Sequence, residues 1–381
     1  MRYWTFGLAG LCWLVGVLCI GNQEVRSDES QPMLEEMVLF QNGDRQYARY
    51  RIPSLVVTTR GTLLALCEGR RLTGGDWDDV DLALRRSVDG GRTWSPIQFI
   101  ADQGALTMGN ACPVVDRTTG TIWLPFCRGR QPGRGNSEIL LTKSTDDGQT
   151  WSPPVNISKT TMDPAWPYVG TGPGHGIQLK NGRLLIPCWA DATETCGEIQ
   201  TSFCFYSDDH GVNWKRGEQL TRNASDECDL VELTDGRIYL NARSRQGKKQ
   251  RAFAFSKDGG HSWSAVDYDS RQPEPSCDGA LIRLSDPHHF QKGRILVSCP
   301  ANPDARDHMM IRLSYDECQT WPVEKLLNPN YSGYSDLAIT DDQTVLCLYE
   351  TEGCSKMTLA RFNLEWLTDG KDSLRRKSDI D

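Results

Sequence analysis

Ser87-Val-Asp89-Gly-Gly91-Arg-Thr-Trp94 is the first of five copies of one short pattern, Ser-x-Asp-x-Gly-x-x-Trp, along the chain. The later copies begin at Ser144, Ser207, Ser256 and Ser314. In the last copy Cys318 stands where the others have glycine. The Asp can accept hydrogen bonds from amides of its own turn, the Gly permits a positive φ, and the Trp can pack beneath a hairpin. The pattern predicts a tight turn between two strands, and we expect its Asp residues to be structural and not catalytic.

A second pattern, a turn followed by an apolar strand, alternates with the first. It begins with Gly61-Thr-Leu-Leu-Ala-Leu-Cys67 and returns at steps of 59, 62, 54, 57 and 50 residues. The later copies begin at Gly120, Gly182, Gly236, Gly293 and Gln343. Near-equal units of this length, each with room for several short strands, are typical of a β-propeller. The sequence therefore predicts an all-β fold, a six-bladed β-propeller with four-stranded antiparallel blades.

The composition agrees with such a globular protein. The chain has 381 residues, of which 38% are apolar, and its 42 basic against 50 acidic side chains give a net charge of −8. Thirty-five glycines and nineteen prolines favour turns over helices. The one dense basic run, residues 243–251, is short and interrupted. We therefore exclude a nucleic-acid partner, which would need a basic face.

The N-terminus predicts export. Met1-Arg2 precedes an apolar run that ends at Ile20, and small residues at Cys19 and Gly21 suit a cleavage site, so residues 1–21 indicate a signal peptide. An uncleaved anchor helix is the alternative, because the run approaches spanning length. Both alternatives place the remainder outside the cytosol, in a secreted, periplasmic or extracellular protein. After cleavage we expect no membrane span.

The repeats also set the domain boundaries. We expect the propeller over residues 37–368, a polar linker over 22–36 before it, and a polar tail over 369–381 after it. Residues 37–40 lie ahead of the first repeat, and we expect them to add a strand to the sixth blade and so close the ring.

Twelve cysteines follow the predicted signal peptide. Those in the repeated apolar strands are expected to be small buried hydrophobic residues: Cys67, Cys127, Cys188, Cys299 and Cys347. Cys196 with Cys204, or Cys228 with Cys277, could form disulfides, and sequence alone does not determine pairing. No Cys or His spacing suggests zinc, so we expect no metal and no cofactor. We expect His288 and His289 to lie in a solvated loop.

Strand parity predicts where a functional site would lie. If the turn between strands three and four of a blade lies on one face, the loops before strand one and after strand two gather on the other face, around the central axis. Those loops carry arginines, a tyrosine and carboxylates from separate blades: Arg51, Arg70, Asp76, Glu227, Arg243, Arg306, Tyr334 and Glu350.

With its Arg51-Ile-Pro53 motif and its Asp-box repeats, the chain resembles an exo-α-sialidase (neuraminidase), from about residue 37 to residue 362. The segment Gly170-Thr-Gly-Pro-Gly-His-Gly176 is similar to the corresponding stretch of secreted bacterial sialidases. The Arg-Ile-Pro motif alone or the Asp-box repeats alone would be a weak signal, but their combination in this order is specific. The resemblance implies retaining hydrolysis of terminal sialic acids from glycoproteins, glycolipids and oligosaccharides, with no cofactor.

The resemblance also implies a role for each residue. Arg51, Arg243 and Arg306 match three arginines that grip the substrate carboxylate, because guanidinium groups bind this planar anion bidentately. Tyr334 matches the nucleophile, in place of the carboxylate that most retaining glycosidases use. Glu227 matches the base that activates it, which a phenol with a pKa of about 10 requires. Tyr331 is a rival nucleophile three residues away.

Asp76 matches the acid/base catalyst. Asp78, Asp79 and Asp81 crowd it in sequence, and like-charge neighbours could raise its pKa into the range useful for protonating a leaving group. We expect these three to be solvated loop residues. Glu350 matches the carboxylate that orients Arg51, and we expect Arg70 to line the carboxylate side of the pocket.

Two further functions stay open at this point. The same site could transfer the sugar to another glycan or within the substrate, or could prefer a deaminated nonulosonic acid. A non-catalytic Asp-box propeller would only bind glycans, but a pure lectin has no need of an activated phenol, so Asp76, Glu227 and Tyr334 argue against it. Linkage preference, the acyl group accepted at C5 and the oligomeric state are not determined by the sequence.

Overall fold

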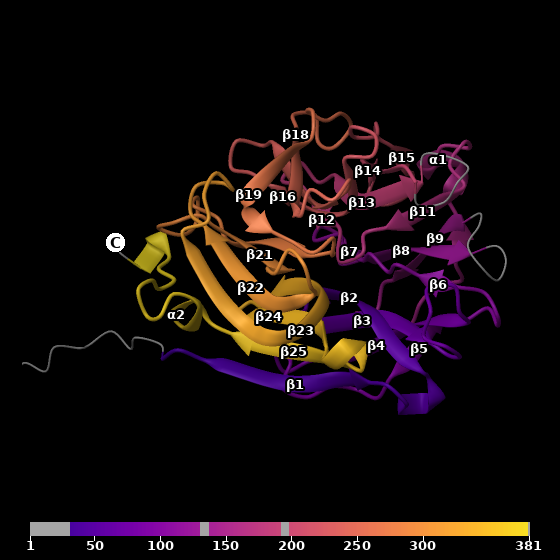
Figure 1. Cartoon of the computed structure of the whole chain (residues 1–381), viewed down its shortest axis with the longest axis horizontal. Coiled ribbons are helices and arrows are strands. Elements are labelled where there is room, and N and C mark those ends of the chain that lie inside the picture. The colour runs from indigo at the N-terminus through magenta and orange to yellow at the C-terminus, as the bar shows by residue number, and fades with distance from the viewer. Residues whose placement is uncertain (1–30, 130–136, 192–197, 380–381) are drawn as a thin grey trace, which may run out of the picture. The chain divides into compact units, whose positions relative to one another are not determined.

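The computed structural model describes residues 31–129, 137–191 and 198–379 (Figure 1). The predicted signal peptide and most of the predicted linker lie outside these residues. The α-helices within them are single turns, α1 (Ser158–Thr161) and α2 (Leu364–Leu367), and strands dominate, which confirms the all-β prediction. Across the described segments, no helix combines the length and the apolar character needed to span a bilayer.

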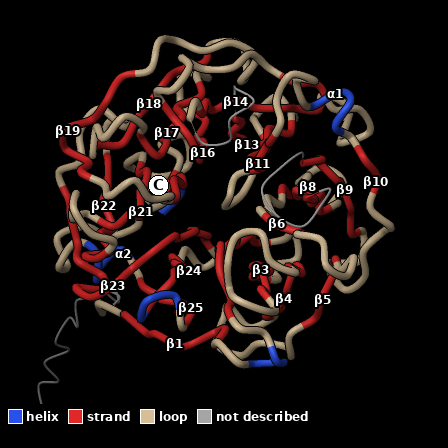
Figure 2. Tube along the Cα trace, turned by 45° about the vertical axis from the view of Figure 1, so that its right-hand side comes forward, coloured by secondary structure: helices blue, strands red, loops and turns tan. Residues whose placement is uncertain are grey.

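Four sheets follow one another along the chain, and Figure 2 shows them around a common centre. The first contains β2 (Arg49–Val57), β3 (Leu63–Arg70), β4 (Val80–Ser87) and β5 (Gln98–Ala101). The second contains β6 (Met108–Gly109), β7 (Val114–Val115), β8 (Ile122–Gly129), β9 (Ser137–Ser144) and β10 (Val155–Asn156). The third contains β11 (Tyr168–Thr171), β12 (Ile177–Gln178), β13 (Leu184–Asp191), β14 (Gln200–Ser207) and β15 (Lys215–Arg216). The fourth contains β16 (Ser225–Glu232), β17 (Ile238–Ser244), β18 (Gln250–Ser256) and β19 (Asp267–Pro273).

The remaining strands form one seven-stranded sheet. Its order is β20 (Ala280–Ser285), β21 (Arg294–Pro300), β22 (Asp307–Ser314), β23 (Val323–Ile339), β24 (Val345–Thr351), β25 (Lys356–Phe362) and β1 (Leu34–Gln41). The first half of β23 pairs with β22 and its second half with β24. The N-terminal strand β1 pairs antiparallel with β25, which confirms the expected extra strand. It begins at Leu34, three residues before the predicted start of the propeller.

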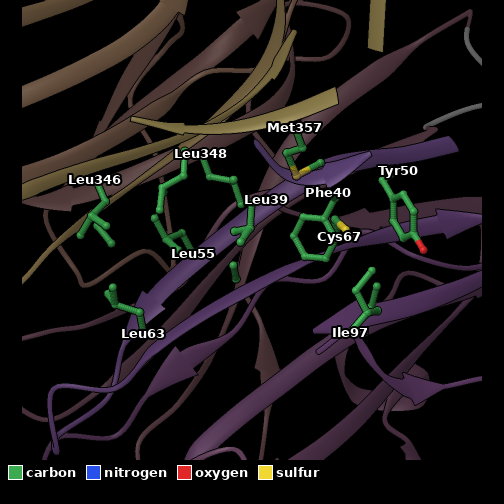
Figure 3. Packing of buried hydrophobic residues seen from close by; sticks show 14 of the residues in the cluster. Leu39, Phe40, Tyr50, Leu55, Leu63, Cys67, Ile97, Leu346, Leu348 and Met357 are labelled. Atoms are coloured by element: carbon green, nitrogen blue, oxygen red, sulfur yellow. The ribbon is translucent and has the colours of Figure 1, made fainter. Parts of the chain in front are cut away.

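Buried side chains fix the beginning of the chain to its end. Leu39 of β1 packs in one cluster with Leu55 of β2, Leu348 of β24 and Met357 of β25 (Figure 3). All four are at most 2% exposed. Burial of apolar surface is the main favourable term in folding, so this cluster stabilises the junction between the first and the last sheet.

The repeated turns have the predicted structure. In the first, Asp89 Oδ1 accepts hydrogen bonds from the backbone nitrogens of Arg92 (3.0 Å) and Thr93 (2.9 Å). Gly91 has a φ of 84°, and its carbonyl accepts a 3.1 Å bond from Trp94 Nε1. Cys318 takes the glycine position of the fifth turn with a φ of 67°, a conformation that is unfavourable for a residue with a side chain.

The suggested Cys228–Cys277 disulfide is wrong, and the Cys196–Cys204 pairing falls on a residue outside the described ones. Cys204, Cys228 and Cys277 are free and buried, and Cys196 lies outside the described residues. Cys228 packs among apolar side chains between the third and fourth sheets, while Cys277 packs against Ile52 and Tyr334. Cys228 and Cys277 thus act as small hydrophobic groups in different clusters, as predicted for the cysteines of the repeated strands, which are also buried and free.

The described part of the C-terminal segment packs on the last sheet. Asp372 accepts a 2.8 Å bond from Arg294 Nε and a 2.9 Å bond from the Tyr315 hydroxyl. The Lys377 amide donates to the carbonyl of His289 over 3.0 Å. The polar residues in this segment therefore form ion pairs and hydrogen bonds with the body of the protein. The His288 side chain is exposed, as expected.

Candidate active site

Three β-bulges carry the central residues of the site. Strand pairing shifts register between Arg51 and Ser54 in β2, between Ser225 and Cys228 in β16, and between Ser332 and Ser335 in β23. A bulge inserts an extra residue and redirects side chains. Arg51, Glu227 and Tyr334 therefore come from the bulged strands β2, β16 and β23. The sequence had suggested the loops before these strands.

These bulges open on a cavity of about 370 Å³. The structure brings together every residue predicted for the site. Seven of them line the cavity: Arg51, Arg70, Asp76, Glu227, Arg243, Arg306 and Tyr334. Glu350 lies directly behind Arg51 and is fully buried.

A tyrosine, a glutamate and an arginine form the centre of the site. The Tyr334 hydroxyl donates to Glu227, with both carboxylate oxygens at 2.7 Å. Arg243 Nη1 donates to the Tyr334 oxygen (3.0 Å) and to Glu227 Oε2 (2.9 Å). Burial and the Glu227 charge raise the Tyr334 pKa well above its ordinary value, against the opposing charges of Arg243 and Arg306. The resting phenol is therefore protonated, with a base in direct contact to accept its proton.

The other two arginines flank the same tyrosine ring. The guanidinium carbon of Arg51 lies 5.3 Å from the ring centroid and that of Arg306 lies 5.2 Å from it. Arg306 Nη2 also donates to the carbonyl of Ser276 over 3.1 Å. Together with Arg243 they surround the phenol with positive charge. Tyr331, the rival nucleophile, instead contacts the Cys354 thiol over 3.0 Å and does not line the cavity.

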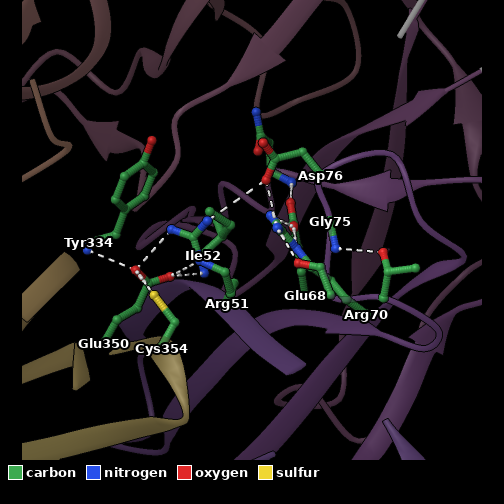
Figure 4. Close-up of polar contacts among 12 residues, drawn as sticks. Arg51, Ile52, Glu68, Arg70, Gly75, Asp76, Tyr334, Glu350 and Cys354 are labelled. Atoms are coloured by element: carbon green, nitrogen blue, oxygen red, sulfur yellow. Dashed lines mark hydrogen bonds and ion pairs between the residues drawn. The ribbon is translucent and has the colours of Figure 1, made fainter. Parts of the chain in front are cut away.

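Glu350 fixes both Arg51 and the tyrosine bulge (Figure 4). It accepts from Arg51 Nε (2.9 Å) and Nη2 (3.0 Å), and from the backbone nitrogens of Ile52 (3.0 Å) and Tyr334 (3.1 Å). Burial alone would raise the Glu350 pKa, but the charge and hydrogen bonds of Arg51 outweigh burial and lower it. A Cβ on Gly333 would lie 2.2 Å from Glu350 Oε2, so only glycine fits at this place in the bulge.

Asp76 lies at the mouth of the cavity, with 66% of its side chain exposed. Arg70 Nη1 donates to Asp76 over 2.6 Å, and Arg70 is itself held by Glu68 (Figure 4). Burial would raise the Asp76 pKa, but Arg70 and then Arg51 lower it below the ordinary value. The predicted rise from crowded carboxylates is therefore wrong, because arginines and not aspartates face Asp76.

The neighbouring aspartates have other contacts than expected. Asp78 and Asp81 are buried, which corrects their assignment as solvated residues. Asp78 Oδ2 accepts from the backbone nitrogens of Leu72 (3.1 Å), Thr73 (2.6 Å) and Gly74 (2.8 Å). Asp81 accepts a 2.5 Å bond from Arg71. A tight loop must satisfy its own amides, and Asp78 does so for the loop that carries Asp76.

The wall formed by the second and third sheets was not predicted. It consists of Asn110, Tyr168, Trp189 and Gln200, together with Trp77. Trp77 lies in the loop of residues 71–79 between β3 and β4, which carries Asp76 and is here named the acid loop. The Trp77 and Tyr168 rings meet edge to face at 5.0 Å, and Tyr168 lies 5.2 Å from Trp189. Tyr168, Trp189 and Gln200 stand in fully buried strands, so their pattern indicates core and not a site.

Among the described residues, one group offers ligands at metal-like spacing. His175, in the loop between β11 and β12, and Asp229 of β16 and Asp336 of β23 are buried, with ligand atoms within 4.8 Å of one another. Asp336 accepts from the Leu55 amide (2.7 Å) and lies 2.8 Å from His175 Nδ1. Asp229 accepts from the Leu281 amide over 2.8 Å. Because hydrogen bonds already occupy these oxygens, the group serves as a polar link between sheets.

Comparisons with known proteins agree with this arrangement. A model of the BNR repeat-like domain matches residues 61–347. The sialidase of Micromonospora viridifaciens is 36% identical over 360 residues, which are 88% of this chain and 55% of that protein. The chain belongs to the sialidase family. The sialidase of Bacteroides fragilis is 33% identical, over 81% of this chain and 61% of its own length. This chain thus spans little more than half the length of these two relatives.

Other relatives match over nearly their whole length or in structure. Sialidase-2 of Cricetulus griseus is 31% identical over 88% of this chain and 96% of its own. The solved Hadza microbial sialidase Hz136 superposes with a TM-score of 0.80 and 30% identity, over 87% of this chain and 69% of that chain.

Proposed function

We propose that this sialidase-family protein is a retaining exo-α-sialidase that hydrolyses terminal sialic acids from glycoconjugates. The observation that carries the proposal is the contact of the Tyr334 hydroxyl with Glu227 and Arg243 inside a cavity lined with arginines. A buried phenol hydrogen-bonded to a carboxylate matches the rule for an activated nucleophile. Sialidases with a tyrosine nucleophile are a known exception among retaining glycosidases.

The proposed framework is a six-bladed propeller. Four separate sheets supply four blades. The seven-stranded sheet supplies two more if β23 is divided where its partner changes from β22 to β24. On this division β23 forms the outer edge of the fifth blade and the inner edge of the sixth, and β1 completes the sixth.

Arg51, Arg243 and Arg306 bind the carboxylate of the acid sugar in this proposal. Arg51 and Arg243 approach Tyr334 from β2 and β17, and Arg306 approaches it from the loop before β22. A carboxylate among them therefore brings the anomeric carbon next to the phenol oxygen. A phenol is neutral until it reacts. It therefore avoids the repulsion that an attacking carboxylate would meet from the substrate's own carboxylate.

The reaction then proceeds in two steps with inversion at each. Tyr334 Oη attacks C2 while Glu227 takes the phenol proton, and Asp76 gives a proton to the departing glycan oxygen. In the second step Asp76 takes a proton from water, which attacks C2, while Glu227 returns its proton to the departing Tyr334 oxygen, so the configuration is retained. In the free site the arginines keep Asp76 ionised. A bound substrate carboxylate neutralises part of that positive charge and favours the proton that Asp76 must carry.

Sialylated glycoproteins, glycolipids and oligosaccharides are the proposed substrates, and no cofactor enters any step. The predicted signal peptide of residues 1–21 supports a secreted or periplasmic protein that meets these glycans outside the cytosol.

Turnover of a fluorogenic sialoside tests the proposal. Wild type should cleave it, and Tyr334→Phe should lose at least roughly 10³-fold in kcat while remaining folded. Tyr331→Phe is the matched control, because its hydroxyl contacts Cys354 outside the cavity, and it should retain activity. NMR of the first product should show the α-anomer. Excess lactose distinguishes hydrolysis from transfer. A folded wild type without turnover, or an active Tyr334→Phe, contradicts the proposal.

A further inference from the structure

Two buried polar atoms in the cavity wall have no hydrogen-bond partner within the described part of the chain. They are Trp189 Nε1 and Gln200 Oε1, in side chains of residues that are 9% and 5% exposed. Both residues line the cavity. A buried polar atom without a partner costs free energy, and in a binding cavity such atoms point to a group supplied by the ligand.

The two atoms lie on one face of the third sheet. Trp189 in β13 stands opposite Ser202 in β14, and Gln200 stands opposite Asp191, so Trp189 and Gln200 are diagonal neighbours. The indole N–H can only donate, and the amide oxygen can only accept. A hydroxyl does both, so a single alcohol group can satisfy both atoms.

An aromatic wall and a glycine shape the space beside this pair. The Tyr168 ring lies 5.2 Å from that of Trp189. A Cβ on Gly170 would lie 2.2 Å from Trp189 Nε1 and 2.5 Å from Asn110 Nδ2, so these two side chains occupy the room that a larger residue would take. Flat aromatic surface suits the plane of an amide and an adjoining methylene group.

The strands that carry Trp189 and Gln200 lie across the centre of the molecule from Glu350, the residue that holds Arg51. Figure 2 shows β13 and β14 on the opposite side of the centre from β24, which carries Glu350. In a six-membered sugar ring, C5 is opposite C2. With the C2 carboxylate held by Arg51, the C5 substituent therefore points toward Trp189 and Gln200.

We propose that Trp189 and Gln200 form a subsite for a hydroxylated N-acyl group at C5, so that the protein prefers N-glycolyl over N-acetyl sialic acid. This inference rests on the proposed function. The N-glycolyl hydroxyl accepts from Trp189 and donates to Gln200, whereas an acetyl methyl leaves both atoms unpaired. The polyhydroxy chain at C6 finds a better match in Asp226 and Arg245, two other residues of the cavity.

Competing sialosides test the subsite. We expect wild type to show a roughly three- to tenfold higher kcat/KM for the N-glycolyl than for the N-acetyl substrate with the same linkage and leaving group. Trp189→Phe, which keeps a ring but loses the N–H, and Gln200→Met should each bring the ratio close to one. Trp123→Phe is the matched control, because Trp123 Nε1 is also buried with no hydrogen-bond partner among the described residues but lies outside the cavity. It should leave the ratio unchanged.

Calorimetry with the N-glycolyl and N-acetyl 2,3-didehydro acids separates this inference from the proposed hydrolysis, since these analogues bind without turnover. A wild type that binds the N-glycolyl analogue more tightly but cleaves neither sialoside supports the subsite and overturns the hydrolysis. Equal wild-type preference, or a preference that survives in Trp189→Phe, overturns the subsite. The subsite is also overturned if Trp189→Phe instead changes the discrimination against a substrate with a shortened C6 chain.

Discussion

Arg51 and Glu350 form one residue pair that links the proposed substrate binding to stability. Glu350 has no exposed surface, and its carboxylate is held by two nitrogens of Arg51. Removing one partner of a buried pair leaves the other charge uncompensated. The pair is therefore expected to be sensitive to substitution even in the absence of substrate.

Arg51→Ala should raise KM for a sialoside and destabilise the protein by about 3 kcal/mol at pH 7. Because Arg51 lowers the Glu350 pKa, the pair's stabilisation is present above the unfolded carboxyl pKa of about 4.3 and is lost as pH falls through the folded value. Urea unfolding at pH 7 and pH 4 should show a larger difference from wild type at pH 7. Arg51→Lys, which keeps the charge, is the control, and an unchanged KM in Arg51→Ala would count against its role.

Single residues show what sequence could and could not predict. Arg51, Glu227 and Tyr334 carry family motifs, so their roles could be expected from resemblance. The pKa of Asp76 could not be predicted, because Arg70 faces Asp76. Asp78 instead binds backbone nitrogens and Asp81 binds Arg71. Sequence neighbours in a loop do not reveal which side chains share its inner face.

In the acid loop, hydrogen bonds made by Asp78 determine where the neighbouring Asp76 lies. Three backbone nitrogens of residues 72–74 donate to one oxygen of Asp78. The carbonyl of Asp78 accepts a 2.9 Å bond from the Thr107 hydroxyl at the second sheet. These bonds fix the loop from both ends, and the position of Asp76 follows from them.

Asp78→Ala should therefore displace Asp76, the proposed acid, while leaving its carboxyl group in place on the chain. Activity on a natural sialyl glycan should fall roughly 10²-fold, because a misplaced catalytic group loses its alignment. An aryl sialoside with a good leaving group needs little protonation, so its turnover should fall much less. Asp79→Asn in the same loop is the control and should act equally on both substrates. Equal losses on both substrates in Asp78→Ala would contradict this role.

The repeated turn is an element with a purely structural role. Asp89 binds the amides of its own turn and does not line the cavity. Asp89→Ala should lower the free energy of unfolding by about 1–2 kcal/mol through these lost hydrogen bonds, with kcat/KM unchanged in the folded protein. Val88→Ala, at an exposed neighbour, should change neither quantity. Chemical unfolding and sialoside turnover measured together would show whether the turn contributes to catalysis.

At the scale of the whole molecule, the regular spacing of the repeats predicted the sheets well. Strands β3, β8 and β13 coincide with copies of the apolar pattern. The continuity of β23 across two pairing partners could not be predicted, because Asn328-Pro329-Asn330 and Gly333, near the change of partner, favour a break. Bulges were missed because β2 and β16 are buried on both faces, so they show no alternation whose phase an extra residue could shift.

The inner strands are joined at the centre by His175, Asp229 and Asp336. Asp336 of β23 binds His175 and the Leu55 amide of β2, so one carboxylate joins three segments of the ring. Burial alone would lower the His175 pKa, but the charges of Asp336 and Asp229 outweigh burial and raise it to about 9. Burial raises the Asp229 pKa as well.

Stability should therefore decline as the solution becomes alkaline. A histidine whose folded pKa of about 9 exceeds its unfolded value of about 6.5 contributes stability that is complete below the lower value and lost as pH rises through the higher one. The raised Asp229 pKa acts in the same direction at lower pH. Wild type should lose up to about 3 kcal/mol of unfolding free energy between pH 7 and pH 10 through His175. His175→Gln should flatten this decline, whereas His210→Gln, at a half-exposed histidine that also contacts a carboxylate, should not. A wild-type curve that is flat over this range, or a decline that persists in His175→Gln, would show that the charged centre does not hold the ring together.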